Sequence, residues 1–177
     1  SMRMPNMAAP AWLMEEVRRA KKGCGADQIE KTSALLAGLK VPTVCDSARC
    51  PNRRECFSQR TATFLILGDV CTRGCAFCAV RHGYPPGLPD PHEPERLAMA
   101  VAELGLTHVV GTSVTRDDLP DGGAARYARV VRVLNRQCPE VKVELLVPDF
   151  LGSENSLAVV VAGLVCVTPA SGYVNPL

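Results

Sequence analysis

Three cysteines near the middle of the chain carry its clearest chemical signal. Cys71, Cys75 and Cys78 have the spacing C-x3-C-x2-C, and they follow an apolar run over residues 61–68. We call them the central set. Thiolates at such spacing are ligands of iron–sulfur clusters, and three of them can hold three irons of a [4Fe–4S] cube. The fourth iron then lacks a protein ligand and stays open to a small molecule.

A second group of three cysteines, the upstream set, precedes the central set. Cys45, Cys50 and Cys56 have the spacing C-x4-C-x5-C, within a polar stretch over residues 43–58. Such a stretch has little core of its own, so we expect it to be irregular and held together by a metal centre. Two sets of three cysteines, each one ligand short of four, predict two clusters.

Disulfides and zinc are the alternatives for these thiols. The chain has nine cysteines, and an odd number with six in two tight groups argues against a disulfide scaffold. Structural zinc takes four ligands, usually from C-x2-C pairs. A zinc site made of the central set and His82 stays open. We expect the remaining cysteines to be core or surface thiols: Cys24, Cys138 and Cys166.

The composition is that of a globular protein. Of the 177 residues, 47% are hydrophobic and 21% are charged, and the formal net charge of +2 does not support a nucleic-acid surface. No apolar run reaches the about 18 residues of a membrane-spanning helix, and the first residues lack the pattern of a secretory signal. We expect neither nucleic acid nor a membrane as a partner. Reduced thiols indicate the cytoplasm, or a mitochondrial or plastid matrix in a eukaryote.

Alternating strand and helix patterns predict the elements that position the central set. Strands are predicted over residues 64–67, 107–110, 141–147 and 164–167. Helices are predicted over residues 93–104, 122–134 and 157–162, with weaker helical stretches over 12–20 and 29–39. Repeated strand–helix units indicate a parallel sheet with right-handed crossovers. We predict an α/β fold: an incomplete TIM-type (β/α) barrel over residues 61–177, after a cysteine-rich, cluster-binding extension over residues 1–60.

Polar residues gather where the predicted strands end. The loop over residues 68–84 holds the central set, and the loops over residues 112–123 and 148–150 follow the next two strands. In parallel α/β folds the chemistry lies in loops at the carboxyl ends of the strands. We therefore expect these three loops to form one site.

The motifs resemble those of the radical S-adenosylmethionine superfamily and, within it, those of lipoyl synthases. The resemblance is carried by residues 63–80 (TFLILGDVCTRGCAFCAV), 44–56 (VCDSARCPNRREC) and 112–124 (TSVTRDDLPDGGA). Biotin synthase, the other sulfur-inserting relative, lacks the upstream motif. The resemblance covers about residues 10–150; beyond Phe150 the chain diverges, and it is shorter than family members, so we expect a truncated or divergent C-terminal part.

The resemblance implies two [4Fe–4S] clusters and S-adenosylmethionine as cofactors. The central set would bind the catalytic cluster, whose open iron chelates S-adenosylmethionine. The upstream set would bind an auxiliary cluster that supplies sulfur. Residues expected near S-adenosylmethionine are Phe77, Thr112, Ser113, Asp121, Gly122 and Gly123. The last three also suit a turn that begins the next helix, and the two readings do not exclude each other.

The implied activity is that of a sulfurtransferase, which inserts two sulfur atoms at C6 and C8 of a protein-bound octanoyl group. Its partners would be octanoylated lipoyl carrier domains or H protein, and an electron donor such as ferredoxin or flavodoxin. The alternative is a truncated, non-catalytic iron–sulfur-binding fragment or pseudoenzyme of the same family. A radical S-adenosylmethionine enzyme with another substrate is a third hypothesis.

Overall fold

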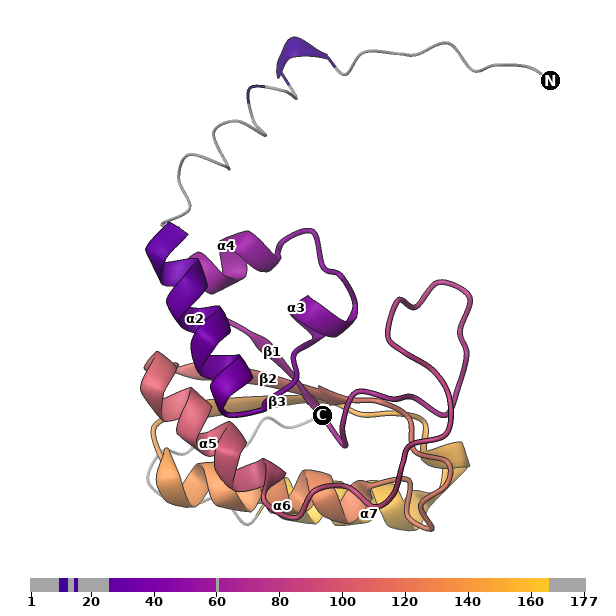
Figure 1. The fold of residues 1–177 in the computed structure, drawn as a ribbon. Helices are drawn as coiled ribbons and strands as arrows, with labels where there is room; N and C mark the ends of the chain where they lie inside the picture. The colour runs from indigo at the N-terminus through magenta and orange to yellow at the C-terminus, as the bar shows by residue number, and fades with distance from the viewer. Residues whose placement is uncertain (1–9, 13–14, 16–25, 60, 166–177) are drawn as a thin grey trace, which may run out of the picture.

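A three-stranded parallel sheet forms the centre of the protein in the computed structural model (Figure 1). The structure describes residues 10–12, 15, 26–59 and 61–165. The strands lie side by side in the order β1 (Thr63–Ile66), β2 (His108–Ser113) and β3 (Lys142–Leu146). Both pairings are parallel, and the register places Gly111 of β2 between Phe64 and Leu145. The predicted parallel α/β arrangement is confirmed.

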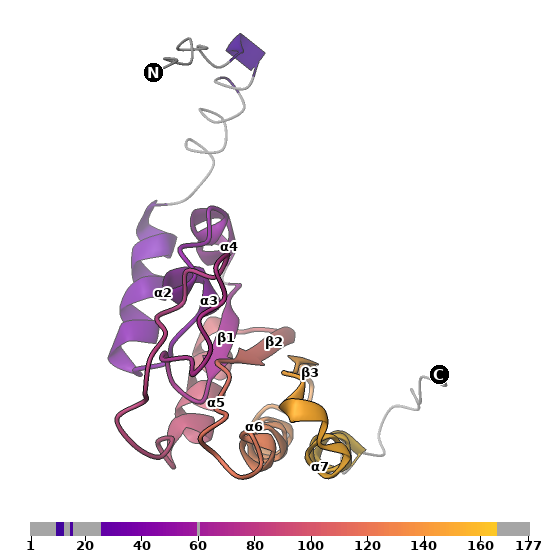
Figure 2. The same cartoon turned by 90° about the vertical axis from the view of Figure 1, so that its right-hand side faces the viewer.

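Three helices follow the strands in turn and cover one face of the sheet: α5 (Glu93–Leu104), α6 (Ala124–Gln137) and α7 (Glu154–Val165). Helix α6 packs between α5 and α7, and Figure 2 shows the three helices along the same side of the strands. Helix α5 has Pro94 in its first turn and ends at Gly105, which adopts a left-handed φ of 63°. Among the helices that the structure describes, none could span a bilayer.

The core lies between the sheet and these helices. Phe64 and Val109 point from the strands into it and are almost fully buried, as is Tyr127 of α6. Because side chains alternate along a strand, the neighbours of Phe64 and Val109 in their own strands point to the opposite face of the sheet. That face carries Thr112 and Leu146 and is partly open, since Leu146 is 52% exposed. The sheet therefore offers one covered face and one partly open face.

Over residues 26–59, the chain forms three helices that lie on the other side of the sheet from α5–α7 (Figure 1): α2 (Ala26–Gly38), α3 (Val44–Ser47) and α4 (Arg53–Ser58). The prediction that residues 43–58 are irregular is wrong, because two short helices form there. The Thr43 hydroxyl accepts the Asp46 N–H at 3.1 Å and caps α3. Thr32 of α2 donates to the Phe57 carbonyl of α4 at 3.1 Å, which joins these two helices.

The strand predicted over residues 164–167 is wrong for the part that the structure describes. Leu164 and Val165 are the last residues of α7. Residues 157–165 are apolar almost throughout, and an apolar run of this kind does not distinguish a buried strand from the end of a helix. Three sequence predictions fall wholly or mostly outside the described residues: the helix over residues 12–20, Cys24 and Cys166.

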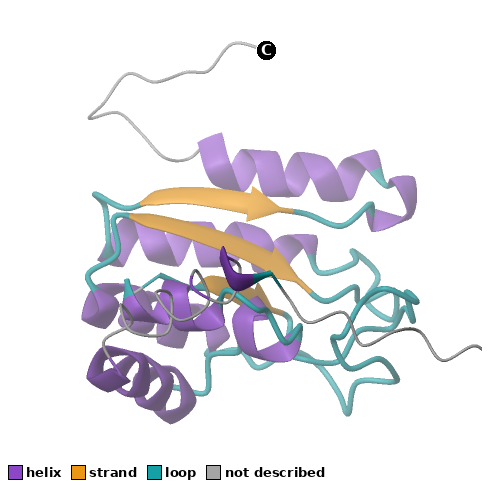
Figure 3. Ribbon diagram, turned by 90° about the horizontal axis from the view of Figure 1, so that it is seen from above, coloured by secondary structure: helices purple, strands orange, loops and turns teal. Residues whose placement is uncertain are grey.

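The carboxyl ends of the strands point to one side of the protein, where long loops gather (Figure 3). The loop after β1 spans residues 67–92 and carries the central set, and the loop after β2 spans residues 114–123. The loop after β3 spans residues 147–149 and leads into η1 (Phe150–Gly152), a single turn of 3₁₀ helix. The three loops thus meet as the sequence predicts.

Candidate functional site

The loop that carries the central set begins at a bend held by a buried carboxylate. Leu67 and Gly68 follow β1 with positive φ angles of 70° and 91°. Glu93, at the start of α5, is 4% exposed and accepts the N–H groups of both residues at 3.1 Å. Burial raises the pKa of the Glu93 carboxyl, and the two N–H bonds oppose this effect. The first turn of α5 therefore fixes the point where the loop leaves the sheet.

Cys71 is the most enclosed thiol of the central set. Its N–H donates to the Arg81 carbonyl at 2.8 Å, and its Sγ accepts the N–H of Thr115 at 3.3 Å. Cys75 and Cys78 are exposed, and the Cys78 N–H donates to the Cys75 carbonyl at 3.0 Å. One member of the set is thus anchored against the loop after β2, while a turn keeps the other two together on the outer side.

The upstream set is more closely packed. Cys45 lies in α3, Cys50 in the turn that follows, and Cys56 in α4, and none of the three is fully exposed. The Cys50 N–H donates to the Cys45 carbonyl at 3.1 Å. Burial raises the pKa of the Cys56 thiol, and the nearby Cys45 and Cys50 raise it further. The structure therefore brings the three predicted ligands together.

Both sets supply the type of donor that an iron–sulfur cluster requires. Within the described residues, no three His, Cys, Asp or Glu side chains are arranged to hold one metal ion, and the zinc site of the central set and His82 stays a prediction. A cube makes a different demand, because each cysteine binds a different iron and the thiols surround the cluster. The six cysteines form no disulfide, so two groups of three soft thiolate donors are available.

The strand residues predicted to lie near S-adenosylmethionine point to different sides of the sheet. Thr112 lies on the open face and donates its hydroxyl to the Leu146 carbonyl at 3.0 Å. The next residue, Ser113, points to the helix-covered face because side chains alternate. The Tyr127 hydroxyl reaches the same Leu146 carbonyl at 3.0 Å. Of the two, Thr112 has the position that a ligand on the open face could reach.

Asp121, Gly122 and Gly123 form the turn that begins α6. The Asp121 carboxylate accepts the N–H groups of Gly123 at 2.9 Å and Ala125 at 2.8 Å. Gly122 and Gly123 have φ angles of 60° and 91°, and a Cβ on Gly123 would collide with Leu67. The bend and this close packing account for the glycines structurally. The turn still borders the site, because Asp121 and Gly122 line a small pocket of about 50 Å³ together with Asp117 and with Pro148 of the loop after β3.

Arg73 is a site residue to which the sequence pattern assigns no role. It lies between Cys71 and Cys75, and its guanidinium contacts Asp117 after β2 at 2.7 and 2.9 Å and Asp149 after β3 at 2.8 Å through two nitrogens. The contact with Arg73 is the main reason that the pKa of Asp149 falls to about 2. The sequence contains one signal for this contact: an acidic residue follows each of two predicted strands, and the cysteine loop after the first strand contains an arginine.

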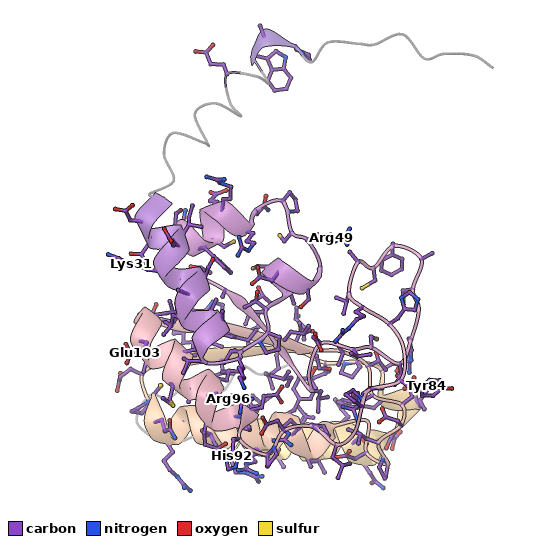
Figure 4. The ribbon with its side chains drawn as sticks, viewed as in Figure 1. Lys31, Arg49, Tyr84, His92, Arg96 and Glu103 are labelled. Carbon is purple, nitrogen blue, oxygen red and sulfur yellow. The ribbon has the colours of Figure 1, made fainter. Side chains whose placement is uncertain are left out.

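Two larger hollows border the loops. One, of about 490 Å³, lies between α2, the end of β1 and the start of α5, and its lining contains no cysteine. The other, of about 580 Å³, is open and lies against the central cysteine loop, with Ser47 and Arg49 on one side and Cys78 on the other. Figure 4 shows Arg49 in the gap between α3 and the central cysteine loop. The hollow therefore adjoins the central set through Cys78 and, on its other side, the end of α3 and the turn after it.

Comparison with known proteins decides the family. The sequence model of the Radical SAM superfamily matches residues 65–165, from β1 to the end of α7, and so includes the whole central set. The chain belongs to the radical SAM superfamily. The match to this superfamily continues beyond Phe150. The prediction that the resemblance to lipoyl synthases ends at Phe150 is wrong, because a match to one of them over 158 residues of this chain must extend past that position.

Within the radical SAM superfamily, the chain is similar to curated lipoyl synthases. The lipoyl synthase of Nitratidesulfovibrio vulgaris is 51% identical over 158 residues, which are 89% of this chain and 51% of the relative. That of Geobacter sulfurreducens is 53% identical over 86% of this chain and 48% of the relative. That of Aquifex aeolicus is 53% identical over 75% and 48%. The predicted resemblance is confirmed, and the chain spans about half the length of the curated relatives it matches.

Proposed function

We propose that the chain acts as a lipoyl synthase-like radical SAM sulfurtransferase, which inserts two sulfur atoms at C6 and C8 of a protein-bound octanoyl group. The observation that carries the proposal is the presence of two groups of three free cysteines, one on the loop after β1 and the other in α3, α4 and the turn between them. A chain about half identical to lipoyl synthases supports this assignment over radical chemistry on an unrelated substrate.

In this proposal Cys71, Cys75 and Cys78 would hold a [4Fe–4S] cluster, which together with S-adenosylmethionine would supply the radical chemistry. The residues of the chain position the ligand and exclude water. Cys71 is held by the Thr115 N–H, so it fixes one corner of the cluster. Phe77, which is 94% exposed on this loop, provides apolar surface that covers the adenosyl group. Thr112 and Asp121 offer a hydroxyl and a carboxylate to its polar groups.

The upstream set binds the auxiliary cluster, which supplies sulfur. Cys45 is buried and Cys50 and Cys56 are half-buried, so this centre is better protected from water than the central set. The hollow of about 580 Å³ is bordered by Cys78 of the central set and by Ser47 and Arg49, which lie between Cys45 and Cys50 in the chain. We propose that the octanoyl chain binds there, because the hollow adjoins both the central set and the segment that carries the upstream set.

The proposal extends to domains and partners. Residues 1–60 form the cluster-binding extension, and residues 61–177 belong to a partial (β/α) barrel, of which β1, β2 and β3 supply adjacent strands. The substrate is carried by an octanoylated lipoyl domain or H protein. Electrons come from a carrier such as ferredoxin or flavodoxin, in a compartment that keeps thiols reduced.

An anaerobic assay tests the proposed activity. The full chain, loaded with iron and sulfide, is incubated with S-adenosylmethionine, dithionite and an octanoyl-lysyl peptide, and the products are followed by mass spectrometry. We expect 5′-deoxyadenosine and a peptide heavier by one and then two sulfur atoms. Replacing the central set with alanine should abolish both products. The matched control is Cys138→Ser, which changes a half-buried thiol outside both sets and should leave both products in place.

The product pattern separates the proposal from its alternatives. If 5′-deoxyadenosine forms without thiolated peptide, the radical half of the activity is present and the sulfur insertion is contradicted for this chain. If neither product forms although the chain holds iron, it is a non-catalytic iron–sulfur protein. Thiolation that persists without the central set contradicts the roles given to Cys71, Cys75 and Cys78.

A further inference from the structure

The central cysteine loop is tied to the loop after β2 by two adjacent residues, Thr72 and Arg73. The N–H and the hydroxyl of Thr72 both donate to the Thr115 carbonyl, at 2.9 and 3.0 Å. The Asp117 N–H donates back to the Thr72 hydroxyl at 3.1 Å. The Arg73 guanidinium holds the Asp117 carboxylate in a fork of two bonds. The two loops are therefore joined over several consecutive residues.

The same guanidinium reaches the third loop. Two of its nitrogens contact the two carboxylate oxygens of Asp149, both at 2.8 Å. Arg73 thus forms a double fork, one on each carboxylate, and links the loops that follow all three strands. A planar guanidinium can do this because its donors lie in a fixed plane, whereas an ammonium group makes contacts at a single point.

The contacts between these loops place a hydrogen-bond donor beside the sulfur of Cys71. Thr115, whose carbonyl is held by Thr72, directs its N–H to Cys71 Sγ at 3.3 Å. A donor to a cluster thiolate stabilises the extra negative charge of the reduced cluster, and hydrogen bonds to the sulfurs are among the factors that set the reduction potential. A loop that moved away from Cys71 would remove this donor.

We propose that Arg73 is a positioning residue, whose double fork on Asp117 and Asp149 holds the Thr115 N–H against Cys71 and thereby raises the reduction potential of the central cluster. This inference rests on the proposed function, since it requires a cluster at the central set. To the proposed function it adds a residue that sets the reduction potential of the central cluster. That potential decides whether a given electron donor can reduce the cluster.

The exposure of these groups makes the proposal testable without unfolding the protein. The side chains of Arg73 and Asp117 are about one-third exposed, at 31% and 30%, and that of Asp149 is 61% exposed. Ion pairs as exposed as these contribute little to overall stability. We therefore expect variants at Arg73 to fold and to take up iron, and to differ from the parent in the geometry of the loops.

The test is a redox titration of the anaerobically loaded full chain, followed by electron paramagnetic resonance. Addition of S-adenosylmethionine identifies the signal of the central cluster, because the ligand changes the spectrum of the cluster with an open iron. We expect Arg73→Gln and Arg73→Lys to shift the midpoint potential of this signal to more negative values, at an iron content equal to that of the parent. Arg81→Gln is the matched charge control. It also removes a cation from the cysteine loop, but the Arg81 guanidinium contacts Asp69 of the same loop and not the loops after β2 and β3.

The outcomes decide between positioning and simple charge. A parental potential in Arg73→Lys together with a shift in Arg73→Gln overturns the proposal, because charge alone would then suffice. An equal shift in Arg81→Gln, or no shift in any variant, overturns it as well. If the parent chain takes up no iron, the proposed function fails separately. Hydrogen exchange at the Thr115 amide of the metal-free protein then decides the positioning: faster exchange in Arg73→Gln supports it, and equal exchange overturns it.

Discussion

Replacing Glu93 tests the account of how the cysteine loop is attached to the sheet. In Glu93→Ala the N–H groups of Leu67 and Gly68 lose their acceptor in a site where Glu93 is 4% exposed. A buried donor without a partner costs about 1–3 kcal/mol, so two of them cost about 2–6 kcal/mol. Removal of a carboxylate that burial disfavours offsets part of this, and a water molecule can enter the vacated space. We expect a net loss of about 2–4 kcal/mol.

The assay is equilibrium unfolding in urea, followed by circular dichroism, on the metal-free chain. The matched control is Glu95→Ala in the same turn of α5, whose carboxylate pairs with Arg129 at the surface at 2.8 Å. An exposed pair of this kind contributes about 0–1 kcal/mol. A loss in Glu93→Ala no larger than that in Glu95→Ala would refute the structural role of the buried carboxylate.

The pH dependence of Glu93 provides an independent check. Burial raises its pKa above the ordinary value of 4.5, so the folded state binds this proton more tightly than the unfolded state. The stability that the protonated Glu93 contributes is fully present below pH 4.5 and is lost as the pH rises through the pKa of Glu93 in the folded state. Glu93→Gln has no such proton. As the pH falls from neutral toward 4.5, the parent should therefore gain stability relative to Glu93→Gln.

Two further substitutions test packing. Gly123→Ala should lower the free energy of unfolding by about 1–3 kcal/mol, because alanine is strained at a φ of 91° and collides with Leu67; Gly38→Ala, where a Cβ meets open space, should change it little. Arg53→Gln should weaken iron retention by the upstream set, since Arg53 lies 4.6 Å over the Phe57 ring and contacts α2. Iron remaining after gel filtration should fall toward about four per chain, with the exposed Arg54→Gln as the control.

Elements decided by neighbouring residues could be predicted from the sequence. The prediction of a helix over residues 93–104 agrees in both bounds with α5, because Pro94 suits the first turn and Gly105 adopts the left-handed conformation that ends it. The placement of the central set after a buried strand follows equally from local pattern. The apolar residues 157–165 show the limit of this reasoning, because hydrophobicity without a clear period allows both a helix and a strand.

Contacts between distant residues could not be predicted. Arg73 meets Asp117 and Asp149 across 44 and 76 positions of the chain, and periodicity contains no information about such a meeting. Glu93 is another example: it suits the first turn of a helix, but its acceptor role depends on a bend 25 or 26 positions away. Likewise, α4 depends on packing against α2 and α3 on packing against β1, and neither contact can be read from the polar sequence of these segments.

The most direct test of the central claim is the iron and acid-labile sulfide content of the anaerobically loaded chain. Two [4Fe–4S] clusters predict about eight irons and about eight sulfides per chain. Alanine at the three positions of either cysteine set should leave about four of each. A colourless chain that takes up zinc and no sulfide would contradict the account, as would a chain that keeps its full iron content without the central set.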